Sequence, residues 1–215
     1  MDYIINNEAT LRLSAFLFML SLIFIIELIF PIYVRRIESY KRWIINFSFV
    51  LINTLILRFL FPILAVSFAS ICIKYNIGIF NYFNFNGLFS VIVSFLFLDL
   101  GIWLQHLLFH KVGILWRFHK IHHSDEEVDF TTGIRFHPIE IIISMIYKFI
   151  LIAIIGPSIA LVIIFEIILN ASSIFNHGNI KIKKKYDLNF RKLIVTPNMH
   201  RIHHSEEEKE TNSNY

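Results

Sequence analysis

Residues 86–110, with the sequence NGLFSVIVSFLFLDLGIWLQHLLFH, form an apolar stretch that ends in two histidines. A bilayer core of about 30 Å requires roughly 20 helical residues, so this stretch is long enough to span a membrane as a helix. His106 and His110 stand four residues apart near its end and therefore project from one helical face. The stretch predicts a membrane helix, over about 86–109, that presents two candidate metal ligands at one membrane surface.

Three further apolar stretches occur, at about 11–33, 45–73 and 139–175. The last is interrupted by Gly156-Pro157, a pair that ends one helix and allows another to begin, so it predicts a helical hairpin. Each arm is short for a full crossing, and both a crossing hairpin and a shallow re-entrant pair remain open. The predicted fold class is all-α, an integral membrane bundle of about four to five helices.

The composition excludes several other classes of protein. The 215 residues are 56% hydrophobic and 17% charged, with a mean hydropathy of +0.62, which is too apolar for an ordinary soluble domain. Only 7 Gly and 5 Pro occur, which favours long helices over a loop-rich fold or a β-barrel. The single Cys72 lies in an apolar run, so neither a disulfide framework nor a cysteine metal site is expected.

Basic residues next to the apolar stretches indicate the orientation in the membrane. They lie beside apolar segments and do not form the stripe that nucleic-acid binding requires. The loop after the first stretch is basic and the loop after the second carries little beyond Lys74, so the first loop is predicted to be cytoplasmic. Segment 176–215 is predicted on the same side. The basic residues concerned are Arg35, Arg36, Lys41, Arg42, Lys181, Lys183, Lys184 and Lys185.

All ten histidines lie after position 105, in segments that this topology places on the cytoplasmic face. Two groups share the spacing i, i+3 and i+4, within the similar strings RFHKIHHS (117–124) and MHRIHHS (199–205), which suggests two similar half-sites. His137 and His177 lie where an apolar helix meets a cytoplasmic segment. The two repeated groups are His119, His122 and His123, and His200, His203 and His204.

This clustering predicts a centre with two metal ions. Neutral imidazole binds first-row metals well, and one ion accepts about four to six ligands, fewer than the histidines present. Zinc suits hydrolysis, and such a site can contain zinc when the protein is isolated. A site beside lipid instead favours redox iron, which activates O₂. Metal-bound imidazoles usually donate to an outer partner. Asp99, Glu166 and Asn170 are the candidate partners, because they share helical stripes with His106 or His177.

At these residues the sequence resembles the fatty acid hydroxylase and sterol desaturase superfamily of membrane proteins. The resemblance covers roughly 40–215 and depends on the boxes His106-x-x-x-His110, His119-x-x-His122-His123 and His200-x-x-His203-His204. The flanking residues are similar as well. They are Arg42-Trp43, Asn46, Asp99-Leu100, Leu115-Trp116-Arg117-Phe118, Thr132, Arg135-Phe136-His137-Pro138 and Thr196-Pro197.

The resemblance implies an O₂-dependent oxidoreductase that hydroxylates or desaturates a C–H bond of a lipid, sterol or fatty acyl, at a non-haem di-iron centre. It implies the boxed histidines and His177 as ligands, with His137 as a further candidate. Electrons would come from a separate carrier and its reductase, because the chain has no dinucleotide or haem motif. Residues 1–44 are expected to form a retained N-terminal anchor with a basic cytosolic loop, and 45–215 the catalytic domain, in a bacterial inner membrane or the endoplasmic reticulum.

Two departures from the family pattern stand out. Leu107 occupies a position where the family commonly has Arg, and the sequence stops at Tyr215, where the family usually continues with Gly and a Trp-Asp segment. Truncation at the C-terminus is therefore an expectation. Two alternative functions remain open: a histidine-rich metal-binding or transport protein of the membrane, and a catalytically inactive family member that binds lipid.

Overall fold

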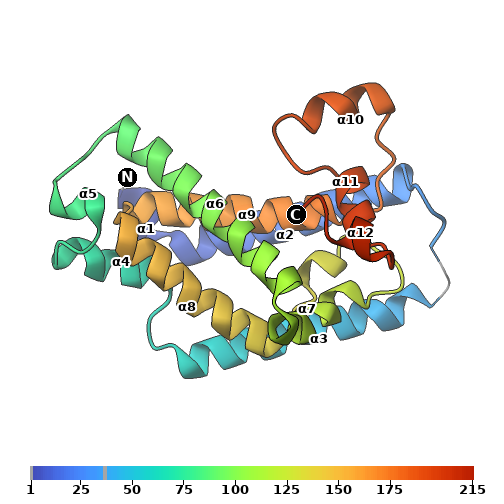
Figure 1. Ribbon diagram of the computed structural model, residues 1–215, viewed down its shortest axis with the longest axis horizontal. Helices are drawn as coiled ribbons and strands as arrows, with labels where there is room; N and C mark the ends of the chain where they lie inside the picture. The colour runs from blue at the N-terminus through green and yellow to red at the C-terminus, as the bar shows by residue number, and fades with distance from the viewer. Residues whose placement is uncertain (1, 36–37) are drawn as a thin grey trace.

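The computed structural model describes residues 2–35 and 38–215, and helices make up the regular structure of these residues (Figure 1). The predicted all-α fold class is confirmed. Arg36, one of the basic residues used for the orientation, lies outside the described residues. The elements are α1 (Asp2–Asn6), α2 (Glu8–Ile29), α3 (Ser39–Leu60), α4 (Ala65–Lys74), α5 (Ile79–Tyr82), α6 (Leu88–Lys111), α7 (Gly113–His123), the 3₁₀ turn η1 (Thr132–Ile134), α8 (Pro138–Ile155), α9 (Ile159–Asn176), α10 (Lys184–Phe190), α11 (Pro197–His203) and α12 (Glu208–Thr211).

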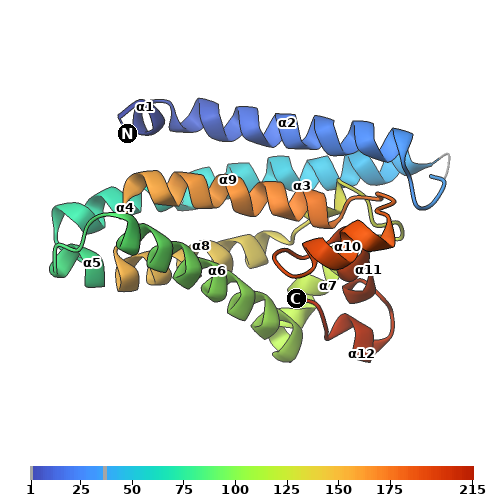
Figure 2. The same ribbon diagram turned by 90° about the horizontal axis from the view of Figure 1, so that it is seen from above.

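Five segments are long and apolar enough to cross a membrane: α2, the stretch Ser39–Tyr82 that contains α3 to α5, α6, α8 and α9. The chain is therefore an integral, multi-pass membrane protein. The long helices run along the length of the molecule, and α7, α10, α11 and α12 gather at one end, which we call the cap (Figures 1 and 2). Many large apolar side chains of the spans are exposed on the surface of the bundle, Leu13 and Phe59 among them. Such exposure is expected for side chains that face lipid.

The second apolar stretch is divided between two helices, which the sequence analysis did not predict. α3 ends at Leu60 and α4 begins at Ala65, with Pro62 between them. Proline lacks the backbone N–H that a helix interior needs, and it disfavours helical geometry in the residue before it. The chain therefore turns at this point instead of continuing as one helix.

The predicted hairpin is present. α8 ends at Ile155, and the C-cap residue Gly156 has a φ of +69°, a left-handed conformation that glycine adopts without strain. Ser158 then caps α9 by accepting a hydrogen bond from the backbone N–H of Leu161. Each arm has 18 residues, or about 27 Å of helix, and both meet the length needed for a crossing.

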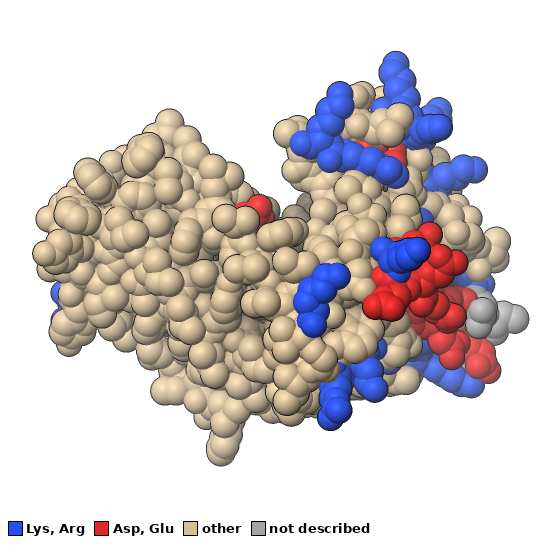
Figure 3. All heavy atoms as spheres, in the orientation of Figure 1, with Lys and Arg blue, Asp and Glu red and all other residues tan. Residues whose placement is uncertain are grey.

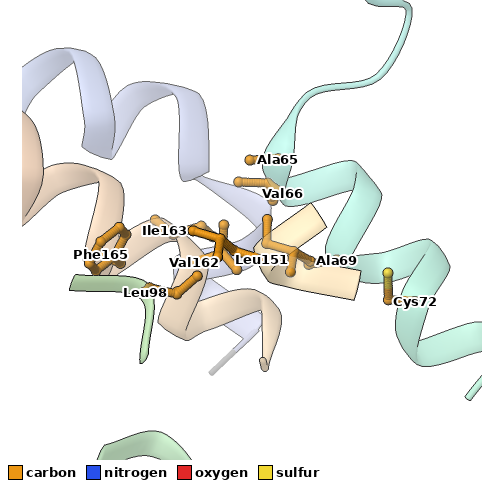
Figure 4. Close-up of a cluster of buried hydrophobic side chains, with 10 residues drawn as sticks. Ala65, Val66, Ala69, Cys72, Leu98, Leu151, Val162, Ile163 and Phe165 are labelled. Atoms are coloured by element: carbon orange, nitrogen blue, oxygen red, sulfur yellow. The ribbon is translucent and has the colours of Figure 1, made fainter. Parts of the chain in front are cut away.

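Two apolar clusters hold the bundle together. The first joins α4, α6, α8 and α9 far from the cap (Figure 4), and its buried members are Ala65, Val66, Ala69, Cys72, Leu98, Leu151, Ile152, Val162, Ile163 and Phe165. The second lies at the cap end and joins α2 and α9 to the chain after α7, through Leu20, Ile23, Phe130, Ile134, Ile174 and Ile180. α2 is thus packed into the same body as the later helices, and the predicted boundary after residue 44 falls inside α3.

Candidate metal centre

Nine of the ten histidines form two groups near the cap end of the bundle. Within each group the candidate ligand nitrogens all lie within 4.8 Å of one another. The first group comprises His106, His110, His119, His123 and His203, and the second comprises His122, His177, His200 and His204. The sequence prediction that the three boxes and His177 come together is therefore matched by the geometry.

The two repeated boxes each contribute to both groups. On α7, His119 and His123 enter the first group and His122 enters the second. At α11 the assignment is reversed: His200 and His204 enter the second group and His203 the first. Side chains at positions i and i+4 of a helix point in nearly the same direction, whereas the side chain at i+3 is rotated away from them. One helical turn can therefore contribute histidines to two neighbouring sites. The duplicated spacing therefore produces two interlocked half-sites and not one site per box.

The other clustered histidines come from the ends of long helices. His106 and His110 occupy the last turns of α6, and α7 follows after Val112, which brings the second box back towards them. His177 is the C-cap residue of α9. Thr196 starts α11 by accepting a hydrogen bond from the backbone N–H of Met199, with Pro197 at the first helical position. These helix ends set the backbone positions from which the imidazoles converge.

In the second group, His177 Nε2 lies 3.0 Å from Nε2 of His122, 3.1 Å from Nε2 of His204 and 2.9 Å from Nε2 of His200. One ring nitrogen carries at most one proton, so hydrogen bonds cannot account for three such contacts. Metal–nitrogen bonds of about 2.1 Å that meet at right angles place their nitrogens about 3 Å apart. The spacing fits imidazoles that surround a common cation.

Backbone contacts identify which nitrogens are free to bind it. His177 Nδ1 lies 2.6 Å from Ser173 O and His122 Nδ1 lies 3.2 Å from Arg135 O. A carbonyl oxygen can only accept, so each Nδ1 carries the proton and each Nε2 presents a lone pair. Two lone pairs 3.0 Å apart repel each other unless a cation lies between them. The residues of this group therefore fit a metal ion.

The first group shows the same pattern. His203 Nδ1 lies 2.8 Å from Ser213 O, which leaves its Nε2 as an acceptor 3.1 Å from Nε2 of His106. His119 Nδ1 lies 2.7 Å from Glu140 Oε1. His110 Nε2, His119 Nε2 and both ring nitrogens of His123 are buried and have no hydrogen-bond partner among residues 2–35 and 38–215. Buried polar atoms normally have a partner, and a metal ion would supply it.

Burial keeps the cap imidazoles neutral, as metal ligands must be. It lowers the pKa of His177 and of His203 to about 4. It also lowers the pKa of the remaining cap histidines, and repulsion between neighbouring imidazolium charges adds to the effect; these residues are His119, His122, His123, His200 and His204. Deprotonated imidazoles bind a metal without first losing a proton.

Aromatic rings close the sides of the centre. Phe136 stacks on His122 with ring centroids 4.7 Å apart, and Trp116 lies 5.0 Å from His110. The Tyr215 ring lies 5.1 Å from the His110 ring. A pocket reaches His110 from the cap surface between Trp116 and the acidic residues Glu206 and Glu208.

His137 is placed apart from both groups. Its Nδ1 accepts a hydrogen bond from the backbone N–H of Ile139, so it is the N-cap of α8, ahead of Pro138. Its ring packs at 5.1 Å from Phe118. We therefore leave His137 out of the ligand set that we propose.

The three acidic or amide residues predicted as outer partners also lie elsewhere. Asp99 is exposed on α6 and Asn170 is exposed on α9. Glu166 is buried and pairs with Lys148 at 2.6 Å and with Arg12 at 3.2 Å, which ties α9 to α8 and α2. Among the hydrogen bonds of the described residues, none joins these three side chains to a histidine. A buried carboxylate within a membrane span needs cationic partners, and Glu166 finds two.

Glu140 is a candidate outer partner that the sequence patterns did not reveal. It lies in the first turn of α8, three residues after His137, and is buried against His119. An acidic residue at the start of a membrane span, three residues after His137, was a usable signal. Helical spacing within one segment does not reveal this contact, because α7 and α8 meet only in the folded chain.

A polar network fixes the loop that follows α7. Arg42 Nε lies 2.6 Å from Asp125 Oδ1, Asn46 Nδ2 donates to Asp125 Oδ2, and Thr132 Oγ1 donates to the same oxygen. Burial alone would raise the pKa of Asp125, but the hydrogen bonds from Arg42 and Thr132 lower it below its usual value. Arg135 extends the network by donating to Asn46 Oδ1. Several residues that flank the boxes are thus linked to one another by hydrogen bonds.

Glu27 connects the N-terminal helix to the centre. Its Oε1 accepts hydrogen bonds from the backbone N–H groups of Phe130 and Asn179, each at 2.8 Å, and Oε2 pairs with Arg35. Asn179 follows His177 by two residues. α2 therefore helps to position a candidate ligand far away in the sequence.

The fold and this site define a multi-pass membrane protein with a histidine-rich candidate metal centre. Comparison with known families is consistent with that class: the model of the fatty acid hydroxylase family matches residues 91–215. The chain belongs to this family. The matched region contains all nine clustered histidines and Glu140.

Curated relatives are similar over half of the chain or slightly more. Alkylglycerol monooxygenase of Homo sapiens is 28% identical over 127 residues, 57% of this chain and 26% of the relative. Ornithine lipid hydroxylase OlsE of Rhizobium tropici is 28% identical over 128 residues, 59% of this chain and 38% of the relative. Alkylglycerol monooxygenase of Caenorhabditis elegans is 33% identical over 113 residues, 50% of this chain and 20% of the relative. The chain thus spans less than two fifths of the length of each of these relatives, and no solved structure matches it.

Proposed function

We propose that this protein is an O₂-dependent oxidoreductase that hydroxylates or desaturates a C–H bond of a membrane lipid, sterol or fatty acyl, at a non-haem di-iron centre. The observation that carries the proposal is the pair of imidazole groups, in which ring nitrogens converge to about 3 Å. Family membership and relatives named as a monooxygenase and a lipid hydroxylase support the reaction class.

Two iron ions, when bound, would supply the activation of O₂ that removal of hydrogen from an unactivated carbon requires. The first group would hold one ion and the second the other, through the nine histidines given above. Glu140, Ser173 O, Arg135 O and Ser213 O would hold their imidazoles in the Nδ1–H tautomer, so that Nε2 faces the metal. The histidines act as ligands and not as proton donors.

The membrane spans determine which substrates reach the centre. His106 and His177 sit at the ends of apolar spans, so a lipid carbon could approach from the bilayer without crossing water. Electrons would come from a separate carrier and its reductase, and the substrate from the bilayer. We place the centre at the cytoplasmic face, because charged side chains gather at the cap end (Figure 3) and short basic loops face the cytoplasm.

The two alternative functions have less support. A transport protein needs metal-binding groups along a path through the membrane, whereas the two groups described here lie near one end of the spans. An inactive lipid-binding member would lose ligands, whereas all the boxed histidines and His177 belong to the two groups.

Lipid analysis of a host that expresses the protein tests the proposal. We expect lipids that have gained one oxygen atom, or lost two hydrogens, only when O₂ and the wild-type chain are present. His203→Ala should abolish the product and lower the metal content together. An unchanged lipid profile from iron-loaded protein supplied with a reductant and O₂ would contradict the proposal, as would full activity of a metal-free protein.

A further inference from the structure

The segment Lys183–Ile194, which contains α10, projects from the cap (Figure 1). All of its residues are exposed except Asp187. It carries five cationic side chains, and Figure 3 shows basic side chains gathered over this projection: Lys183, Lys184, Lys185, Arg191 and Lys192. We call it the basic segment.

The basic segment also exposes large apolar side chains. Leu193 is 88% exposed, and four others are about half exposed. These four are Tyr186, Leu188, Phe190 and Ile194. Apolar groups so close together are unfavourable in water, and a surface loop that only meets solvent does not need them. The composition is that of a segment that lies in a membrane interface.

The single acidic residue of the segment is turned inward. Asp187 is buried, accepts a hydrogen bond from Thr196 Oγ1 at 2.7 Å and pairs with Arg191 at 2.5 Å. Thr196 is also the N-cap of α11. The outward surface therefore presents cations and apolar groups, and it is fixed to the helix that carries His200 and His203.

The segment begins at the edge of the membrane-spanning bundle. Just before it, Lys181 N donates to Phe30 O at 2.8 Å, immediately after the end of α2, and Pro31 pairs with Ile180. Upstream, α9 ends at Asn176. Downstream of the segment, α11 packs against α9. The segment thus begins and ends next to the cap-side ends of two spans.

We propose that Lys183–Ile194 lies in the headgroup layer of the leaflet on the cap side. Its apolar side chains enter the boundary with the acyl chains, and its four lysines bind anionic lipid headgroups. An acidic soluble protein would neutralise the cations but leave the apolar side chains in water, so the bilayer is the better match. The proposal depends on membrane embedding and not on the reaction proposed above.

Site-specific fluorescence on the full chain in lipid nanodiscs tests this placement. An environment-sensitive dye is attached at Leu188→Cys and at Leu193→Cys, with Lys209→Cys on α12 as the matched control. The native Cys72 is buried, and labelling of the wild-type chain gives its background. We expect blue-shifted emission and quenching by lipids with brominated acyl chains at both segment positions, and neither effect at Lys209→Cys. Emission at Leu188→Cys and Leu193→Cys equal to that of the control would overturn the proposal.

Lipid charge tests the headgroup contact. In discs with phosphatidylglycerol, the ratio of inserted to exposed dye at Leu193→Cys should fall about fivefold for each cation changed, as in Lys184→Gln or Lys192→Gln. Leu188→Gln would keep the charge and should lower the ratio through lost apolar burial. Equal ratios in neutral and anionic discs would overturn the headgroup contact. Protection of the dye that requires an added acidic redox protein would overturn the bilayer in favour of protein docking.

Discussion

Nδ1 of His119 lies 2.7 Å from Oε1 of Glu140, and both side chains are buried. The contact joins a histidine of the second box to the first turn of the next membrane helix. Because a carboxylate that accepts from a ligand imidazole fixes its tautomer and raises its basicity, this pair should control metal affinity.

Glu140→Ala should weaken metal binding in the first group by about 10- to 100-fold. Glu140→Gln keeps an acceptor oxygen and should lose less. Metal titration of the two purified variants, with thermal unfolding as a check on folding, measures the difference. Wild-type affinity in a folded Glu140→Ala protein would show that the contact has no role in holding His119.

Single ligand variants should affect one group more than the other. His110→Ala removes a nitrogen of the first group and His200→Ala one of the second, so each should lower the metal content from about two ions towards one. His137→Ala is the matched control: it should retain both ions and cost about 1 kcal/mol as a lost helix cap. Metal content by mass spectrometry decides, and a loss of metal in His137→Ala equal to that in His200→Ala would contradict the assignment.

Glu27→Ala should destabilise the protein strongly. The change leaves the backbone N–H groups of Phe130 and Asn179 without their acceptor and Arg35 without its carboxylate. Removal of one partner from a buried ion pair costs about 3–5 kcal/mol. Thermal unfolding in detergent micelles measures the effect, and an unfolding midpoint equal to that of the wild type would refute it.

Glu166→Gln should lower stability without lowering the metal content. Lys148 and Arg12 lose their carboxylate partner inside the bundle, but no imidazole loses a contact. Parallel unfolding and metal analyses separate the two effects. Loss of metal at unchanged stability would instead support the role as an outer partner of His177 that the sequence stripe predicts.

The spans, the hairpin and the convergence of the boxes could be predicted from sequence, because each depends on local patterns: apolar length, Gly156-Pro157 and histidine spacing. The assignment of the α7 histidines to two groups could not be predicted. His122 and His123 are neighbours in sequence, and the group that each one joins depends on how α7 faces α11. Asp99 and Glu166 illustrate a second limit. Helical spacing shows which residues share a face, but not what that face packs against. Asp99 lies on an exposed face, and Glu166 pairs with two cationic side chains.

Anaerobic titration of the purified, metal-free chain with ferrous iron tests the central claim most directly, when X-ray absorption is used to identify the ligands. We predict saturation at about two ions per chain, each with a shell dominated by imidazole nitrogens. Saturation at one ion, or binding that survives replacement of both His122 and His203, would contradict two interlocked histidine sites.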